Sequence, residues 1–308
     1  MLQTLKNPFQ ALPRLFLLCV ALALTGCYKH TRIVQQISTP DVVMNATADD
    51  LVRRLNANFD AIQTLNAGVT LTASTGGGHA GKVTEYTAFK GYILIRKPRD
   101  LRVILQVPVF GGVGMDMVSN GKDFKLIIPH ENKAMVGTDE VKTPSPKPLE
   151  NLRPHVFFDA FLVPSVTSAE SVALTQSERI LTTDVHKNKA IEEPDYDLAV
   201  LRKPTGSSSG NASSNILETA RVVHYSRVTL LPYQQDIYDE KGRIVTSVLY
   251  DHYQRFGDLD FPMSIDIRRP YDEYELKVVV TKLTANKPLD DDQFQVEIPP
   301  GTTIQQMN

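Results

Sequence analysis

The sequence predicts an α+β fold built on one antiparallel sheet, and three observations lead to that prediction. Short segments that alternate apolar and polar residues follow one another with brief turns between them. Connections this short join antiparallel strands rather than parallel ones. Two other segments place apolar residues three and four positions apart, as amphipathic helices do. Charged residues make up an ordinary 22% of the chain and tryptophan is absent, so we expect a globular protein of one large or two small domains.

The first 26 residues resemble an export signal. Lys6 and Arg14 precede an apolar run from Leu15 to Leu24, with no acidic residue among them. The run is shorter than the roughly 20 apolar residues that a transmembrane helix needs. We therefore expect this segment to direct export and not to span the membrane.

The end of the signal resembles a bacterial lipobox, the motif whose cysteine receives a diacylglyceryl group. The motif consists of Leu24, Thr25, Gly26 and Cys27. The other cysteine, Cys19, lies inside the apolar run, so the mature chain would have one cysteine and no internal disulfide. We expect Cys27 to be an acyl anchor, which needs two or more chains to hold stably. The alternative is an ordinary signal peptide with an incidental cysteine.

Residues 28–46 show no sustained periodicity and include Pro40. A flexible coil of about 20 residues places the domain on the order of 25 Å from the membrane. We interpret residues 27–46 as an acylated N-terminus and tether.

A first helix is predicted over residues 47–68. Thr47 caps it and Asp50 completes a capping box, and acidic residues suit the positive end of a helix. Gly68 is expected to end it. One apolar stripe runs along the helix, formed by Leu51, Leu55, Phe59 and Ile62.

About five strands are predicted after this helix, up to residue 138. Gly, Pro, Asn or Asp residues separate the strand segments, which are VTLTAST, KVTEYTAFKGYILIRKP, DLRVILQVP, GMDMVSNG, KDFKLIIPH and KAMVGT. The proline-rich TPSPKP at 143–148 then interrupts the strands, as a stiff loop or, alternatively, a polyproline spacer. A second apolar helix is predicted within 149–164, with the core-facing residues Leu152, Val156, Phe157, Ala160 and Phe161.

About six further strands are predicted in the C-terminal half. They fall in DLAVLRKP, TARVVHYSRVTLLP, QQDIYDEKGRIVTSVLYDHYQRFGDLDFPMSIDIRRP and YELKVVVTKLTANKPL. The polar insertion at 205–215 should be a mobile loop. Residues 239–242 give a hairpin signal.

The order of these elements resembles that of the LolA/LolB-like lipoprotein carrier family. The resemblance covers most of residues 48–301, and the insertion at 205–215 departs from the compact members of the family. It implies a strongly curved antiparallel sheet that forms an unclosed barrel with helices across its concave mouth. It rests on LNANFDAIQTLNAGVTL, GYILIRKPRDLRVIL, VPVFGGVGMDMVSNGKDFKLIIP, DEKGRIVTSVLYDHYQ with DFPMSIDI, and KLTANKPLDDDQFQVEIPPG.

The lipobox suits the anchored receptor LolB, or outer-membrane lipoproteins of the DUF4292 kind, better than the soluble carrier LolA. In families with this anchor, an aspartate after the cysteine tends to retain the protein at the inner membrane, and here Tyr28 follows. The expected domains are a signal peptide (1–26), an acylated tether (27–46), a single LolA/LolB-like domain (47–301) and a C-terminal tail (302–308).

The resemblance implies a noncatalytic protein of the outer membrane that faces the periplasm. Lipid or the acyl chains of another lipoprotein would occupy a hydrophobic cavity, with no cofactor or metal. Other envelope proteins are further candidate partners. A scaffold of the same fold with a filled interior is the alternative function, and an envelope hydrolase with a Ser, His and carboxylate cluster is a third.

Two groups of residues are candidates for contacts. An apolar, glycine-softened connection resembles the place where LolB carries a protruding hydrophobic loop; it consists of Val107, Val109, Phe110 and Val113. This loop would touch lipid or an acyl chain, whereas the alternative places Phe110 in the core. Arg96, Arg99 and Arg102 would contact a headgroup or a partner carboxylate, and otherwise are ordinary arginines at strand ends.

Other chemistry finds no support in the sequence. The glycines at 111–114 lack the Lys-Ser/Thr pair of a phosphate loop, and the seven histidines have no metal-ligand spacing. No G-x-S-x-G motif is present. After residue 26 the formal charge is near −4, which gives no electrostatic reason to bind nucleic acid.

Overall fold

The computed structural model describes residues 31–32, 34–77, 81–109, 111–139, 145, 147–184, 189–204 and 216–307. The signal, the lipobox, Cys27, Phe110 and the insertion at 205–215 lie outside these residues. Two compact units are distinguished: Met1–Thr39 with Ile180–Glu192, and Pro40–Arg179 with Glu193–Asn308. We call them the small unit and the large unit and describe each by itself.

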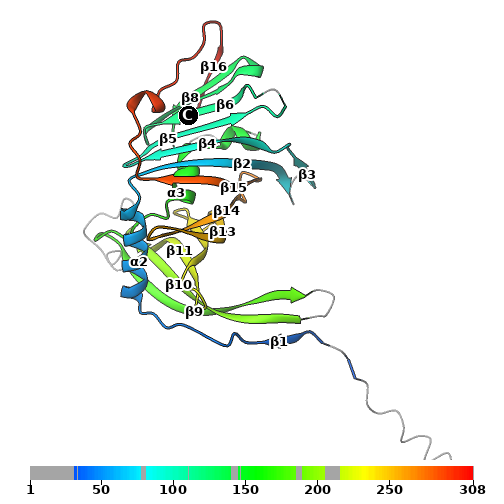
Figure 1. The fold of residues 1–308 in the computed structure, drawn as a ribbon, viewed down its shortest axis with the longest axis vertical. Helices are drawn as coiled ribbons and strands as arrows, with labels where there is room; N and C mark the ends of the chain where they lie inside the picture. Colours follow the sequence, from blue (N-terminus) through cyan, green and yellow to red (C-terminus); the bar gives the residue numbers. More distant parts are fainter. Residues whose placement is uncertain are drawn as a thin grey trace, which may run out of the picture. The chain divides into compact units, whose positions relative to one another are not determined.

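The described part of the large unit contains the α-helices α2 (Ala48–Ala61) and α3 (Pro154–Phe161) (Figure 1). Its strands and 3-10 helices are β2 (Thr64–Gly77), β3 (Lys82–Glu85), β4 (Phe89–Arg96), β5 (Asp100–Gln106), β6 (Val113–Ser119), β7 (Asp123–Ile128), η2 (Pro129–Glu131), β8 (Lys133–Thr138), η3 (Pro148–Asn151), β11 (Glu218–Ser226), β12 (Pro232–Tyr238), β13 (Ile244–Phe256), β14 (Leu259–Arg269), β15 (Tyr274–Ala285), η5 (Asp291–Phe294) and β16 (Thr303–Met307). Two strands, β9 (Ser171–Asp184) and β10 (Lys189–Arg202), run through both units.

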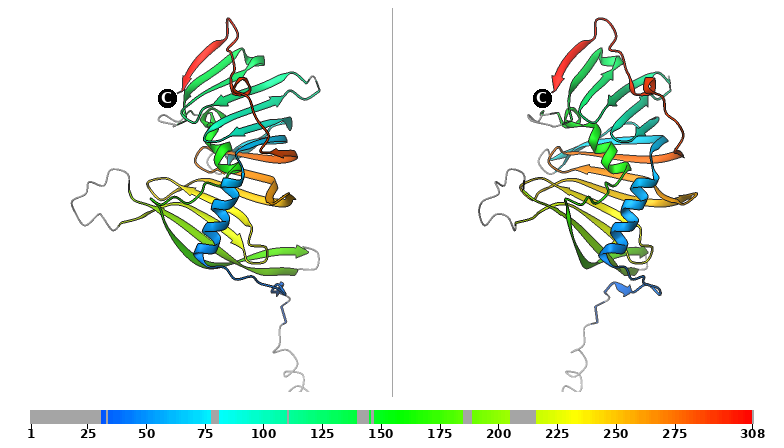
Figure 2. Two further views of the ribbon diagram at one scale, coloured as in Figure 1. Left: turned by 60° about the vertical axis from the view of Figure 1, so that its left-hand side comes forward. Right: turned by 90° about the vertical axis from the view of Figure 1, so that its left-hand side faces the viewer.

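The strands form one curved sheet, as predicted. Their order is β10-β11-β12-β13-β14-β15-β2-β4-β5-β6-β7-β8-β16, with β9 beside β10 and β3 beside β2. The pairs from β10 to β15 and from β2 to β8 are antiparallel, whereas β16 is parallel to β8. Strand β15 pairs with β2 from Leu65 to Thr75. This pairing joins the strands of the C-terminal half to those of the N-terminal half in one sheet. Within the described ranges the two ends of this order do not pair with each other, so the sheet is open (Figure 2).

The capping box of the first helix is confirmed, but its predicted end at Gly68 is wrong. Thr47 caps α2 through its side chain, and Asp50 bonds back to the Thr47 N–H at 2.9 Å. The helix ends at Ala61, and β2 begins at Thr64. From there buried and half-buried residues alternate, because β2 pairs on both sides, with β4 and with β15. Strand pairing therefore overrides the helical pattern of this segment.

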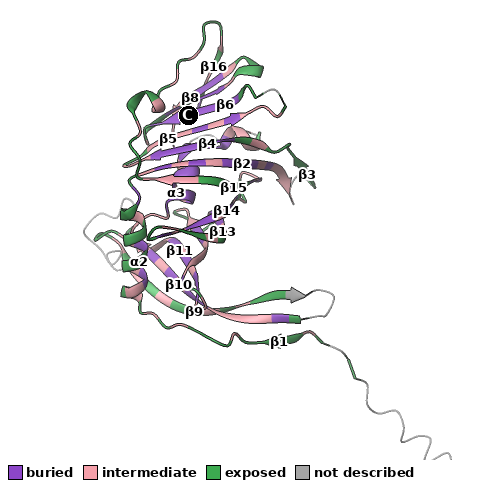
Figure 3. Ribbon diagram, viewed as in Figure 1, coloured by how far each residue is buried: buried purple, intermediate pink, exposed green. Residues whose placement is uncertain are grey.

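Both helices pack on the same face of the sheet. Residues directly opposite each other in a strand pair share a face, and such pairs link Val223 of β11, through β12 and β13, to Ile267 of β14. Leu51 and Leu55 of α2 pack in one cluster with Val223. Phe157 and its helix α3 pack in a second cluster with Ile267. Figure 3 shows buried residues, coloured purple, along the strands and on α3.

Two described strands of the large unit were not predicted. The segment of β9 was left without a strand although it alternates in part. The five residues of β16 lie in the segment expected to be a tail, yet Met307 packs into the larger core cluster.

Candidate functional site

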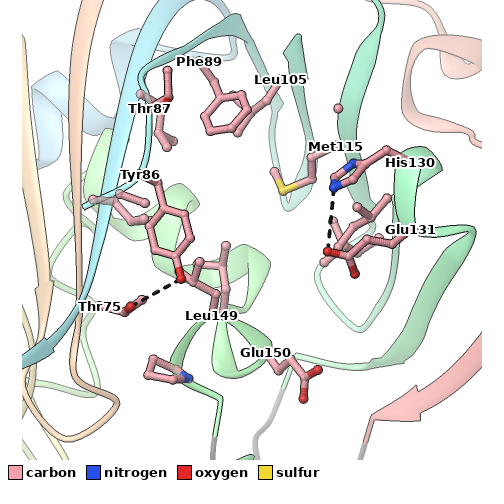
Figure 4. A pocket seen from close by; sticks show the side chains of 18 of the residues that line it. Thr75, Tyr86, Thr87, Phe89, Leu105, Met115, His130, Glu131, Leu149 and Glu150 are labelled. Carbon is pink, nitrogen blue, oxygen red and sulfur yellow. Dashed lines mark hydrogen bonds and ion pairs between the residues drawn. The ribbon is translucent and has the colours of Figure 1, made fainter. Parts of the chain in front are cut away.

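An apolar cavity of about 880 Å³ lies between the sheet and the segment that leads into α3. The sheet contributes side chains of seven strands, β2, β4 to β8 and β15, among them Phe89, Leu105 and Met115. Leu149 of η3 faces them (Figure 4), and Phe157 of α3 also lines the cavity. Because methionine is flexible and polarizable, Met115 suits a site that accepts apolar groups of variable shape.

A charged latch holds one side of this cavity. The Glu150 carboxylate of η3 accepts hydrogen bonds from Lys133 Nζ of β8 at 2.9 Å and from Ser145 Oγ at 2.6 Å, and Lys147 Nζ lies 3.3 Å away. The Ser145 hydroxyl has the largest effect and, with both lysines, lowers the pKa of Glu150 to about 2, against the raising effect of burial. The latch fixes η3, and with it the cavity wall formed by Leu149, to β8.

No sequence pattern indicates this latch, because Glu150 and Lys133 are 17 residues apart, in the segment predicted as the second helix and at the start of a predicted strand. The opposite side of the cavity carries a neutral polar pair, the hydroxyls of Thr75 and Tyr86, 3.4 Å apart. The cavity is therefore apolar inside with polar groups at its border, the arrangement expected of a site for an amphipathic ligand.

One described residue of the candidate hydrophobic loop lines the cavity, and two others are exposed. Val107 lines it together with Pro108 and Gly114. Val109 is 96% exposed and Val113 is 45% exposed. Phe110 lies outside the described residues, so its contact with lipid stays a prediction.

The three candidate arginines do not line the cavity. Arg96 pairs with Asp100 and Asp291, each at 2.8 Å, and Arg102 makes a bidentate pair with Asp116. Both also bond carbonyl groups of the segment that contains η5, so they fasten that segment to β4 and β5.

Arg99 differs from the other two, because its side chain is half exposed and lies 3.5 Å from Asp159 of α3. Burial raises the pKa of Asp159, and Arg99 opposes this effect. A headgroup or partner contact remains a prediction for all three arginines.

One histidine has the neighbours that an enzyme hypothesis would require. His224 of β11 faces Asp197 through Nδ1 at 2.7 Å and Asp236 through Nε2 at 3.3 Å. Burial alone would lower the pKa of His224, but the hydrogen bonds to Asp236 and Asp197 outweigh it and raise the pKa. Since a carboxylate occupies each ring nitrogen, neither is left to take a proton from a serine as a catalytic triad requires.

The described residues include neither a candidate membrane span nor a candidate metal site. They contain no helix long and apolar enough to cross a membrane. Nor do they contain a group of three or more His, Cys, Asp or Glu residues that could hold a metal ion.

No family model matches the chain, and no curated protein matches its sequence. Solved structures do match. A DUF1329 family protein from Desulfovibrio piger is 17% identical, with a TM-score of 0.50 over 80% of this chain and 95% of that one. This likeness shows a shared fold.

The matches also include two structures with lower scores. A LolA superfamily protein from Nitrosomonas europaea is 12% identical, with a TM-score of 0.47 over 82% of this chain and 99% of that one. A proposed outer membrane lipoprotein-sorting domain from Vibrio parahaemolyticus is 11% identical, with a TM-score of 0.47 over 80% and 97%. The structural neighbours of this chain are thus DUF1329 and LolA-superfamily proteins.

Proposed function

We propose that this protein is a lipoprotein of the outer membrane, anchored through Cys27 and facing the periplasm, that holds lipid or the acyl chains of another lipoprotein. In this proposal α2 and α3 lie across the concave mouth of the sheet, and the protein is a noncatalytic receptor of the LolB or DUF4292 kind. The observation that carries the proposal is the apolar cavity of about 880 Å³.

Physical arguments support an acyl ligand. The cavity volume lies within the range of about 300–1,000 Å³ that is usual for small-molecule sites. Each methylene group that leaves water for such a site contributes about 0.8 kcal/mol. The exposed Val109 and Val113 beside the cavity would let a chain pass from lipid to the interior without crossing a polar surface.

The alternative function is an envelope scaffold whose interior is filled by its own side chains. A scaffold with a filled interior would have no cavity. The cavity between the sheet and η3 therefore supports the carrier function over the scaffold.

Uptake of an acyl probe tests the cavity. Ala73 lines it, so Ala73→Phe fills the space and should weaken binding of a fluorescent fatty acid about tenfold, the equivalent of roughly two lost methylene contacts. Val279→Phe, on the exposed face of β15, is the matched control and should bind normally. Native mass spectrometry should also find lipid in the purified Cys27→Ala protein. Absence of both lipid and probe uptake would contradict the proposal.

The anchor is tested separately. Cys27→Ala removes the proposed acylation site and should shift much of the protein from the membrane fraction to the soluble periplasmic fraction, because the acyl chains supply most of the membrane affinity in this proposal. Metabolic labelling with a palmitate analogue should mark the unaltered protein and not the variant. Palmitate label that persists in the Cys27→Ala variant would show that Cys27 is not the acylated residue.

A further inference from the structure

The small unit is held together by a short strand pairing close to the N-terminus. Strand β1 (Gln36–Ser38) runs parallel to the start of β10, with Ile37 opposite Ala190. The Ser38 hydroxyl donates to the Ala190 carbonyl at 3.3 Å. We call the described residues of Met1–Thr39 and Ile180–Glu192 the arm.

The arm exposes several large apolar side chains although it is small. Val34 is 69% exposed, Ile37 47%, Ile180 56% and Leu181 38%. Because Ile180 and Leu181 are consecutive residues of β9, they project from opposite faces of the strand. At this point each face of β9 exposes one aliphatic side chain, and exposed apolar side chains of this kind are typical of interaction sites such as a membrane surface.

The length of the chain places the arm near the anchor. Cys27 precedes Gln36 by nine positions, and nine residues span at most about 30 Å when fully extended. Val34 is closer still, at most about 25 Å along the chain from Cys27. Any bilayer that holds acyl groups on Cys27 is therefore within reach of the arm.

Charge does not favour an acidic or basic partner for the arm. Residues 31–39 and 180–192 contain three basic and two acidic side chains. An arm close to neutral has little electrostatic attraction to anionic lipid, so its exposed aliphatic side chains supply the affinity for a surface.

We propose that the arm lies in the headgroup and acyl boundary of the bilayer that holds the anchor, with Val34, Ile37, Ile180 and Leu181 buried among phospholipids. This inference rests on the proposed anchor at Cys27. The arm is then a second membrane contact, separate from the cavity and from the loop at 107–113. It makes the attachment of the protein stronger than its acyl chains alone.

The absence of tryptophan from the chain allows a direct test. Leu181→Trp places one indole on the arm, and Val279→Trp, at a 49% exposed position of the large unit, is the matched control. The lipidated full-length proteins are reconstituted in phosphatidylcholine vesicles with plain or brominated acyl chains. We expect the brominated lipid to quench L181W roughly twofold or more, as for a group about 5–10 Å deep in the interface, and to leave V279W unchanged. Equal L181W emission in both lipids overturns the proposal.

Two further measurements separate this inference from the proposed function. If the full-length protein does not float with vesicles, the anchor fails; if it floats while L181W is not quenched, the arm alone fails. In the Cys27→Ala protein, Ile180→Asp together with Leu181→Asp should lower vesicle binding about tenfold and leave acyl-probe uptake unchanged. Quenching that depends on anionic lipid, or an L181W shift that needs an added envelope protein, would also overturn the proposal.

Discussion

At the scale of single residues, Val109 stands out because its backbone is strained and its side chain is unsupported. Its φ is 73°, a left-handed conformation that costs a β-branched residue on the order of 1–3 kcal/mol. The side chain is 96% exposed, so no burial offsets that cost. Its neighbours Val107 and Pro108 line the cavity. We therefore expect the exposed side chain of Val109 to take part in ligand binding.

Val109→Gly should therefore separate stability from binding. Glycine adopts this φ without strain, so we expect the free energy of unfolding to rise by about 1 kcal/mol while acyl-probe uptake falls. Val113→Gly, at the start of β6, loses apolar surface without relieving strain and should destabilise the protein slightly. Urea denaturation and probe titration measure the two effects. A Val109→Gly protein that binds the probe normally would remove the loop from the binding site.

The arginines show what the sequence could not reveal at this scale. Strand-end positions made Arg96, Arg99 and Arg102 equal candidates for a ligand contact. Arg102 pairs with Asp116 of the neighbouring strand β6, and Arg96 pairs with Asp291 of η5. No local pattern links the members of these pairs, because only the folded chain brings them together.

At the scale of elements, η3 depends on its latch. Four residues of 3-10 helix have little stability of their own, and the segment reaches β8 through Glu150 and Lys133. The lowered pKa of Glu150, about 2 against 4.5, corresponds to at most about 3 kcal/mol of stabilisation.

Glu150→Gln should lower the free energy of unfolding by about 1–3 kcal/mol at pH 7 and widen the cavity. The stabilisation is fully present above the unfolded pKa of 4.5 and is lost as the pH falls through the folded pKa of about 2. The difference between the two proteins should therefore vanish near pH 2. Glu131→Gln, on a half-exposed side chain at the same border, is the control and should have little effect. A constant difference across this pH range would contradict the latch.

The elements also show where local patterns suffice. The capping box at Thr47 and Asp50 and the apolar core of α3 could be predicted because each is a local signal. The end of α2 could not, because Leu65 suits both the helix stripe and a strand face until β4 and β15 pair with β2. The strand β9 was missed because polar residues interrupt its apolar positions and leave no continuous apolar face.

At the scale of the whole molecule, the sheet order explains both the fold and the cavity of the large unit. Most of the antiparallel strands could be predicted from alternation and turn spacing, whereas β9 and β16 could not. The pairing of β15 with β2 puts both halves in one sheet, and neither strand alone carries a sequence signal for it. The cavity forms because η3 and α3 leave space between themselves and that sheet. The resemblance to a known family supplied the curvature that the pattern of residues could not.

The open end of the sheet gives the last prediction. Strand β16 covers the edge of β8. The backbones of the two strands approach so closely that a Cβ at Gly137 would lie 2.1 Å from the Met307 carbonyl oxygen. Gly137→Ala should displace β16 and cost about 1–3 kcal/mol, and removal of residues 303–308 should expose the β8 edge in the same way. Uncovered edges pair with other chains, so both proteins should self-associate in analytical ultracentrifugation. Gly112→Ala, which meets no atom within 4 Å, should leave stability and mass unchanged. A monomeric, fully stable truncated protein would mean that these residues are only a tail and that β8 is the true edge of the sheet.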